Sequence, residues 1–363
     1  MSVTVPFNAL TPAEDAADGK AAIDRVLASG WFVLGPEVEA FETEFAAASR
    51  VPHAVGVGTG TDAITLILRA LDIGPGDEVI TAPLSAAYSP LAIMMAGARP
   101  VFADIDAARL TLDPRAAEAA ITSRTRAIMP VHLYGQAADM RAFEAIAAKH
   151  NLAIVEDAAQ AHLATADQRP VGTIGVAAAT SFYPTKNLGA PGDGGAVLTR
   201  DAGLAARVKR LRNGGQTSRY HHEEFGVNSR LDEMQAAILR ARRLFLPAWT
   251  AKRRAIAGRY RSALRSASVN VPKEFDAGHV YHLFPVLAAE RDRFQAHMKN
   301  QGVETLIHYP VPIPRQPALQ STSPAMCPIA DHVCSQVVSL PMYPGLSETA
   351  VAAVAEAAST FGG

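Results

Sequence analysis

One lysine of the sequence stands between an apolar, strand-like run and a glycine-rich loop. Lys186 lies in residues 181–189 (SFYPTKNLG), and residues 192–195 (GDGG) follow shortly after. An amine at the buried end of a strand loses solvation, which lowers its pKa and makes it a nucleophile able to form a Schiff base. The alternative is a lysine whose amine simply reaches water at the end of the strand. This motif alone leaves both interpretations open.

A second strand-like run ends in two acidic residues, Glu156 and Asp157. Burying a carboxylate costs free energy unless a cation lies close to it. A protonated pyridine nitrogen would be such a cation, because an aspartate can hold that proton in place. The alternatives are a helix cap or a Mg²⁺ ligand. A Mg²⁺ site is disfavoured because no Walker-type glycine–lysine loop precedes the pair.

A third feature is the small-residue turn at residues 58–62 (GTGTD), between a predicted strand and a predicted helix. Backbone amides at a helix N-terminus, together with threonine hydroxyls, form a cradle for a phosphate, although such turns are also common structural caps. The turn lacks the spacing of a dinucleotide fingerprint, so a Rossmann dehydrogenase fits poorly. A phosphate cradle, a strand-end aspartate and a strand-end lysine together are what pyridoxal 5'-phosphate (PLP) requires.

The composition excludes several classes of function. The 363 residues carry a formal net charge of −1 without a basic stripe, so nucleic-acid binding is not expected. We expect no membrane contact, because no apolar run is long enough to cross a bilayer. The start of the chain lacks a signal-peptide pattern, so we expect a cytoplasmic protein. The two cysteines, Cys327 and Cys334, are expected to be semi-buried structural thiols without a disulfide or a metal.

Short apolar runs alternate with helical stretches from residue 54 onward, which predicts an α/β fold with a mostly parallel sheet between helices. The predicted strands at residues 178–183 and 196–199 have few residues between them, so one of them is expected to be antiparallel. We predict a large PLP-binding domain over residues 1–245 and a smaller α+β domain over residues 246–363. The predicted strands are residues 54–57, 78–82, 100–103, 127–132, 153–156, 178–183, 196–199 and 280–287.

Several helices can also be placed. An N-terminal helix is expected to start at Thr11 and Pro12, with Glu14 completing a capping box, and to end at Gly30. A long arginine-rich helix is expected over residues 231–264, interrupted near Pro247. The other predicted helices are residues 37–48, 62–71, 91–96, 113–121, 140–150 and 291–301, and a last one after residue 347, with a proline-rich loop at residues 310–328.

The chain resembles the DegT/DnrJ/EryC1/StrS family of PLP-dependent sugar aminotransferases, which have fold type I of the PLP enzymes. The motifs keep their order and spacing over nearly the whole chain: residues 60–63 (GTDA), 156–162 (EDAAQAH), 181–189 (SFYPTKNLG), 226–232 (GVNSRLD), 307–310 (IHYP) and 339–344 (SLPMYP). The resemblance implies a homodimer with its active sites at the subunit interface and nucleotide-linked keto sugars as substrates.

The same resemblance implies the roles of individual residues. Lys186 would form the Schiff base and move protons, Asp157 would pair with the pyridine nitrogen, and Gln160 would lie on the side of the phenolic oxygen. Tyr183 and His308 would contact the substrate. For His308, an ordinary packed histidine is the alternative.

The phosphate cradle implied by the resemblance consists of Gly60, Thr61 and Ser181, with Asn228 contributed by the partner subunit. For Asn228, a turn or cap residue before the following helix is the alternative.

The chain departs from the family at three positions. Ala86 stands where many members have an aromatic ring that stacks on the cofactor, a loss of roughly 1 kcal/mol of stacking. Tyr88 could replace that ring only if the loop turns differently. Leu163 and Gly214 stand where a glycine and a histidine are frequent, which affects the choice of substrate more than the chemistry.

The resemblance therefore implies an aminotransferase that moves an amino group from glutamate or glutamine to a nucleotide-linked keto-deoxysugar. Residues 212–222 and 226–233 are more similar to members that aminate C3 than to those that aminate C4. One alternative is a PLP-dependent sugar dehydratase of the same fold, although such relatives replace the lysine by histidine. The other is a regulatory protein that binds PLP or sugar without turnover.

Overall fold

The computed structural model describes residues 4–11, 13–320 and 326–362. At its centre is a seven-stranded sheet with the order β1-β9-β8-β5-β4-β2-β3. Only β9 is antiparallel to its neighbours, which confirms the expected mostly parallel sheet and its one reversed strand. The strands are β1 (His53–Val57), β2 (Glu78–Thr81), β3 (Arg99–Phe102), β4 (Thr125–Met129), β5 (Ala153–Asp157), β8 (Ala177–Ser181) and β9 (Gly195–Thr199).

Helices cover both faces of this sheet, so neighbouring strand residues enter different cores. On β5, Ile154 packs into one hydrophobic cluster and Val155 into another. Strands buried on both faces are expected to be continuously apolar, which is why these runs were recognisable in the sequence. One cluster includes α3 (Gly60–Ala70), α4 (Tyr88–Met95) and α7 (Ala202–Leu211). The other includes α2 (Pro36–Ala48), α5 (Pro114–Ala119) and α6 (Met140–His150).

The N-terminal helix α1 (Ala16–Ser29) starts later than predicted. Its N-cap position is Asp15, Pro12 lies outside the described residues, and Gly30 ends the helix in the left-handed conformation as expected. The predicted capping box is wrong, because the Glu14 carboxylate instead accepts hydrogen bonds from the Trp249 indole at 2.6 Å and the Lys252 ammonium at 3.0 Å. Side-chain donors from another helix therefore take the place of the helix's own amides.

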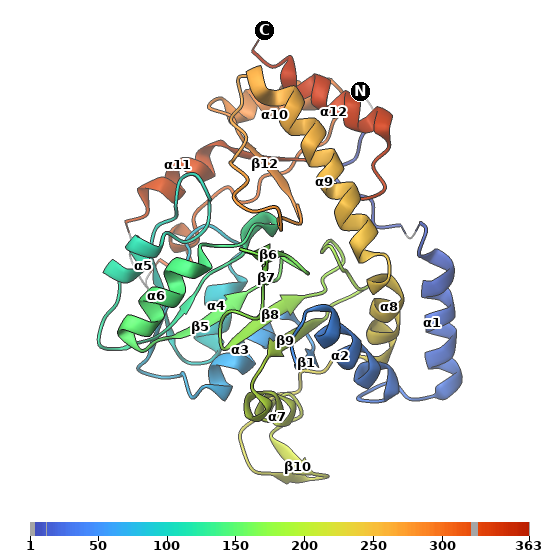
Figure 1. Cartoon of the computed structure of the whole chain (residues 1–363), viewed down its shortest axis with the longest axis vertical. Helices are drawn as coiled ribbons and strands as arrows, with labels where there is room; N and C mark the ends of the chain where they lie inside the picture. The colour runs from blue at the N-terminus through green and yellow to red at the C-terminus, as the bar shows by residue number, and fades with distance from the viewer. Residues whose placement is uncertain (1–3, 12, 321–325, 363) are drawn as a thin grey trace.

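The long arginine-rich helix is divided in two, α8 (Glu233–Arg243) and α9 (Leu246–Ala263), with Pro247 in the first turn of α9. Helix α9 leads away from the sheet to the C-terminal elements (Figure 1). These are β12 (Phe284–Leu287), α10 (Arg291–Asn300), α11 (Pro328–Gln336), β13 (Val337–Leu340) and α12 (Glu348–Ser359). Strands β12 and β13 pair antiparallel. Helix α11 and strand β13 were not predicted, and the predicted strand at residues 280–287 forms only in its second half.

The remaining elements are short. A two-stranded ribbon, β10 (Gln216–Ser218) and β11 (His221–His222), projects beyond α7 at the bottom of Figure 1. The others are β6 (Thr165–Ala166), β7 (Arg169–Pro170) and the 3₁₀ turns η1 (Leu133–Gly135), η2 (Leu264–Ser266) and η3 (Ile313–Arg315). Both cysteines are free thiols, as predicted, and they are more fully buried than expected. None of the described helices combines the length and apolar character needed to cross a bilayer.

Candidate active site

The N-terminal end of α3 packs directly against the ends of β8 and β9. A Cβ atom on Gly60 would lie 2.8 Å from the Ser181 Cβ, and one on Gly195 would lie 2.4 Å from the Thr59 carbonyl carbon. Only glycine permits these approaches, which place the first residues of α3, Gly60 and Thr61, beside Ser181. Amides in the first turn of a helix lack helical partners and attract anions. The three residues of the predicted phosphate cradle therefore share one corner of the sheet.

The turn before α3 is held by side chains from two parts of the chain. The Thr59 hydroxyl caps the helix by accepting from the Asp62 amide at 3.0 Å. Ser229 accepts from the Gly58 amide at 2.9 Å and donates to the Asp62 carboxylate at 2.8 Å. Its neighbour Asn228 is exposed, and its side chain has no hydrogen bond within the described part of the chain. Within one subunit, it is therefore Ser229 that reaches the turn.

Asp157 ends β5 and is buried, with 6% of its surface exposed. One carboxylate oxygen accepts from the Ser89 hydroxyl at 2.6 Å, and the other accepts from the Ala159 amide at 3.0 Å. A carboxylate offers about four acceptor positions, so two remain available. No ion pair to Asp157 is found among the residues that the structure describes. The carboxylate is oriented but retains the capacity to bind a cationic donor.

Lys186 lies in a tight turn that follows β8. Its amide donates to the Tyr183 carbonyl at 2.8 Å, and the Ala190 amide donates to the Phe182 carbonyl at 2.7 Å. Burial lowers the pKa of the Lys186 amine from 10.5 to about 8, although the nearby Asp157 carboxylate acts in the opposite direction. At a pH near 8, a large fraction of this amine is therefore unprotonated and nucleophilic.

Gln160 lies inside a hydrogen-bond network that also involves two tyrosines. Its carbonyl oxygen accepts from the Tyr134 amide at 2.7 Å, and its amide nitrogen donates to the Tyr309 hydroxyl at 3.1 Å. A second N–H of that nitrogen remains to donate to a ligand oxygen. Tyr134 in turn donates to the His308 carbonyl. The network fixes the orientation of the Gln160 amide.

The two predicted substrate contacts differ in their surroundings. Tyr183 is exposed, with 52% of its surface accessible. His308 is half-buried, with its Nδ1 atom 3.0 Å from the Ser339 hydroxyl and its ring stacked on Phe7 at 5.6 Å. Burial and the neighbouring Lys186 amine lower the pKa of His308 to about 4, so its imidazole is neutral at physiological pH.

Where an aromatic ring is frequent in the family, this chain has the small side chain of Ala86. Ala86 is half-buried and lies before α4. Tyr88 is the first residue of α4, and 65% of its surface is exposed. Helix α4 also places Ser89 on Asp157, a contact that the sequence analysis missed. A serine within an apolar run, one residue after an exposed tyrosine, was the only local signal for it.

These residues fit the requirements of PLP. The start of α3 and Ser181 would hold its phosphate, Lys186 would bind its aldehyde carbon, and Asp157 would accept the proton of its ring nitrogen. The spare N–H of Gln160 would face its phenolic oxygen. The residues that would hold the cofactor thus lie at the carboxyl ends of β5 and β8, where open α/β sheets bind their ligands.

Comparison with known proteins identifies the family of this chain. Residues 13–359 match the DegT/DnrJ/EryC1/StrS aminotransferase family. The chain belongs to this family. It is 49% identical to the dTDP-3-amino-3,4,6-trideoxy-alpha-D-glucose transaminase of Streptomyces venezuelae over 94% of this chain and 92% of that protein. The protein is thus an enzyme, a transaminase of the family, and PLP is the cofactor expected for its members.

Two solved structures share the fold. The structure of S. venezuelae DesV in complex with a ketimine intermediate has a TM-score of 0.94 at 48% identity and covers 97% of both chains. The structure of NtdA from Bacillus subtilis with bound cofactor PMP has a TM-score of 0.91 at 30% identity, covering 98% of this chain and 85% of that one. The α/β fold of PLP-dependent aminotransferases, predicted from the sequence, is confirmed.

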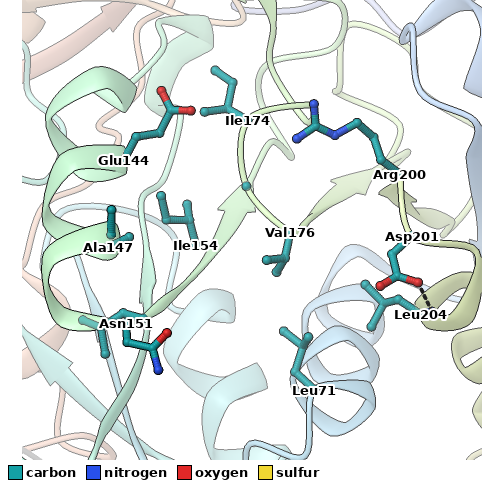
Figure 2. A pocket seen from close by; sticks show the side chains of 13 residues that line it. Leu71, Glu144, Ala147, Asn151, Ile154, Ile174, Val176, Arg200, Asp201 and Leu204 are labelled. Atoms are coloured by element: carbon teal, nitrogen blue, oxygen red, sulfur yellow. Dashed lines mark hydrogen bonds between the residues drawn. The ribbon is translucent and has the colours of Figure 1, made fainter.

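A surface hollow of about 750 Å³ lies elsewhere. It is at the opposite ends of the central strands, where Asn151 precedes β5 and Val176 precedes β8 (Figure 2). Its two acidic residues are already engaged: Glu144 is paired with Arg169 at 2.6 Å, and Asp201 accepts from the Gly203 amide at 2.7 Å. None of the predicted site residues lines it, so size alone does not identify the active site.

Proposed function

We propose that this enzyme moves an amino group from glutamate or glutamine to a nucleotide-linked keto-deoxysugar, with PLP as its cofactor. The observation that carries the proposal is the convergence of Lys186, Asp157 and the α3 phosphate cradle at one end of the sheet. When bound, PLP supplies an electron sink for the carbanion that forms during amino transfer. The chain's own groups then determine which proton moves and where.

In this proposal, the Lys186 amine would hold the cofactor at its aldehyde carbon. As a free amine, with its pKa lowered to about 8, Lys186 would accept and return the proton that moves during transfer. Asp157 keeps the ring nitrogen protonated, and the hydrogen bonds from Ser89 and Ala159 hold its carboxylate in place. The keto sugar uses the same residues in the reverse order.

We further propose a homodimer whose active sites are shared between subunits. Asn228 is exposed beside the turn that Ser229 contacts, where a second subunit could bring its own Asn228 to the phosphate. Exposed aromatic residues support a covered interface: Trp31, Phe32, Tyr220 and Phe225 are each at least half accessible. Mixing inactive Lys186→Ala and Asn228→Ala proteins tests the sharing, because a hybrid dimer has one intact site. No recovery despite proven subunit exchange contradicts it.

For the substrate, we propose amination at C3 rather than C4. The 49% identical relative is named for a 3-amino sugar. A change of the reacting carbon shifts the whole sugar, and a misplacement of about 1 Å can cost roughly 100-fold in rate. The small side chain of Ala86, in place of the aromatic ring that is frequent in the family, is compatible with such a shift. A dehydratase is disfavoured because the lysine is retained.

The decisive experiment incubates the PLP-loaded protein and glutamate with matched 3-keto and 4-keto nucleotide sugars. We expect a mass increase from amination of the 3-keto compounds, with the nitrogen assigned to C3 by NMR. Efficient amination of only the 4-keto compounds would refute the C3 proposal and leave the aminotransferase proposal standing. Borohydride treatment should attach the cofactor to Lys186, and a label on any other lysine contradicts the proposed mechanism.

A further inference from the structure

The residue that follows the reactive lysine is fully engaged with the C-terminal part of the chain. The Asn187 side chain is buried, and its amide nitrogen donates to the Val280 carbonyl at 3.0 Å. Its carbonyl oxygen lies 3.2 Å from Nδ1 of the buried His282. Both polar ends of Asn187 therefore contact residues more than 90 positions away, on the segment that leads into β12.

This contact determines the tautomer of His282. Because the amide nitrogen of Asn187 faces a carbonyl, its oxygen faces the imidazole, and an amide oxygen can only accept. Nδ1 of His282 must then carry the hydrogen, which leaves Nε2 unprotonated in the neutral ring. Burial keeps the ring neutral by lowering its pKa, and the charged or titratable groups around it act in the same direction: Lys186, Arg253, His162 and His308.

The segment that carries His282 is itself held rigidly against the sheet domain. The Val280 amide donates to the Gly135 carbonyl at 2.9 Å. A Cβ on Gly135 would lie 2.8 Å from the His282 nitrogen, so only glycine allows this approach. On the other side, the buried Arg253 guanidinium donates to the carbonyls of Tyr281 at 3.1 Å and His282 at 3.3 Å.

We propose that His282 is a positioning residue that sets the conformation of Lys186 through Asn187, so that the reactivity of the amine depends on the docking of this C-terminal segment. The inference rests on the proposed function, because it takes Lys186 as the reactive lysine. The peptide between Lys186 and Asn187 is fixed at one end by the turn to Tyr183 and at the other by the Asn187 side chain. Loss of the His282 hydrogen bond removes one of the two contacts that fix that second end and leaves only the one to the Val280 carbonyl.

His282→Leu in the PLP-loaded enzyme is the first test. We expect kcat to fall by roughly 100-fold, since about 1 Å of misplacement has that effect, while KM for the nucleotide sugar changes little. We also expect the midpoint of the pH titration of the visible absorption band to shift, a signature that a loss of stability alone does not produce. His282→Gln, which can still donate to Asn187, should restore part of kcat and return the midpoint toward the wild-type value.

His279→Leu is a matched control. His279 lies three residues away and is equally buried, but its ring stacks on Tyr281 at 3.8 Å and its Nδ1 accepts from the Tyr281 amide. It has no hydrogen bond to Asn187. We expect a comparable drop in melting temperature with an unchanged spectroscopic midpoint. If His282→Leu and His279→Leu behave alike in kcat and in the titration, the inference is wrong.

A double-mutant cycle with Asn187→Ala tests the path itself. If His282 acts through Asn187, the double variant should lose no more kcat than the more damaged single variant. If the loss of kcat in the double variant equals the product of the losses in the two single variants, the inference is wrong. Borohydride labelling of the wild type separates the two failures: a label outside Lys186 refutes the proposed function, whereas a label on Lys186 with multiplicative losses refutes only the role of His282.

Discussion

Glu156 and Asp157 are neighbours on β5, and both are buried, yet their surroundings differ. The Glu156 carboxylate receives a hydrogen bond from Nε2 of His132 at 3.0 Å and three more from backbone amides. Those amides belong to Gly172 at 2.9 Å, Ile174 at 2.9 Å and Gly175 at 2.7 Å. Asp157, on the opposite face of the strand, receives two hydrogen bonds from the residues that the structure describes. The carboxylate with all its acceptor positions filled holds the loop, and the one with free positions is the one that we propose as the partner of the cofactor.

The electrostatics agree with this division. Burial by itself would raise the pKa of Glu156, but the hydrogen bonds from His132, Gly172 and Gly175 outweigh it and lower the pKa below 4.5. The Ala138 amide donates to Nδ1 of His132 at 3.1 Å, so the hydrogen of this imidazole is on Nε2 and points at Glu156. Glu156 is thus stably ionised without needing a ligand.

Asp157→Asn tests the difference between the two carboxylates most directly and has the largest expected effect. The substitution keeps the shape but removes the charge that would hold the ring nitrogen protonated. We expect kcat to fall on the order of 10²–10³-fold, the usual cost of one lost electrostatic contact in an active site, with little change in melting temperature. Steady-state kinetics and calorimetry measure both quantities. Full activity in this variant would show that Asp157 is not the partner of the cofactor.

Glu156→Gln should produce the reverse pattern, a loss of stability with little loss of kcat per folded molecule. Replacing one oxygen by an NH₂ group sets a donor against backbone donors, which we expect to cost about 2–3 kcal/mol of unfolding free energy. Because the pKa of Glu156 is lowered on folding, its stabilisation is complete above pH 4.5 and is lost as the pH falls below that value. The difference between wild type and variant in urea unfolding should therefore shrink in acid.

Glu233 extends the comparison to a second carboxylate that is bound by several backbone amides. It is buried and accepts from the amides of Gly35 at 2.8 Å, Glu37 at 2.8 Å and Val38 at 2.9 Å, at the start of α2. We expect Glu233→Gln to cost about 2 kcal/mol, because an ionised acceptor at a helix N-terminus is replaced by a neutral one. Hydrogen exchange should show faster opening of α2. An unchanged exchange rate in α2 contradicts the assigned role.

The smallest expected effect concerns Lys186, the cation that lies near the incompletely hydrogen-bonded carboxylate of Asp157. Its pKa is lowered from 10.5 to about 8, so between these values the unfolded chain binds more protons than the folded one. Stability of the cofactor-free protein should therefore rise with pH across this window. Lys186→Met should raise the unfolding free energy below pH 8 by about 1 kcal/mol after allowance for partial exposure, and by nothing above pH 10.5. Equal melting curves of the wild type and Lys186→Met at pH 7 would contradict this prediction.

Much of the fold was predictable from the sequence because its determinants are local. The central strands were found as short apolar runs, since a sheet covered on both faces needs apolar side chains on both. The site residues stood out because a lysine, an aspartate and a glycine–threonine turn each follow such a run. The missed elements, α11 and β13, adjoin the proline-rich loop, where local patterns are weak.

The tertiary structure decided what each of these groups contacts. No local pattern shows that Glu156 is bound by His132 and by the loop at residues 172–175, that Ser89 orients Asp157, or that Asn187 joins Lys186 to His282. The N-terminal capping box failed for the same reason, since the donors of α9 took Glu14. These contacts join residues far apart in sequence, and their geometry exists only after the helices have packed on the sheet. The strands and the chemical groups at their ends could therefore be predicted from local sequence. Packing determines which of those groups have all their hydrogen bonds filled and which remain free to bind.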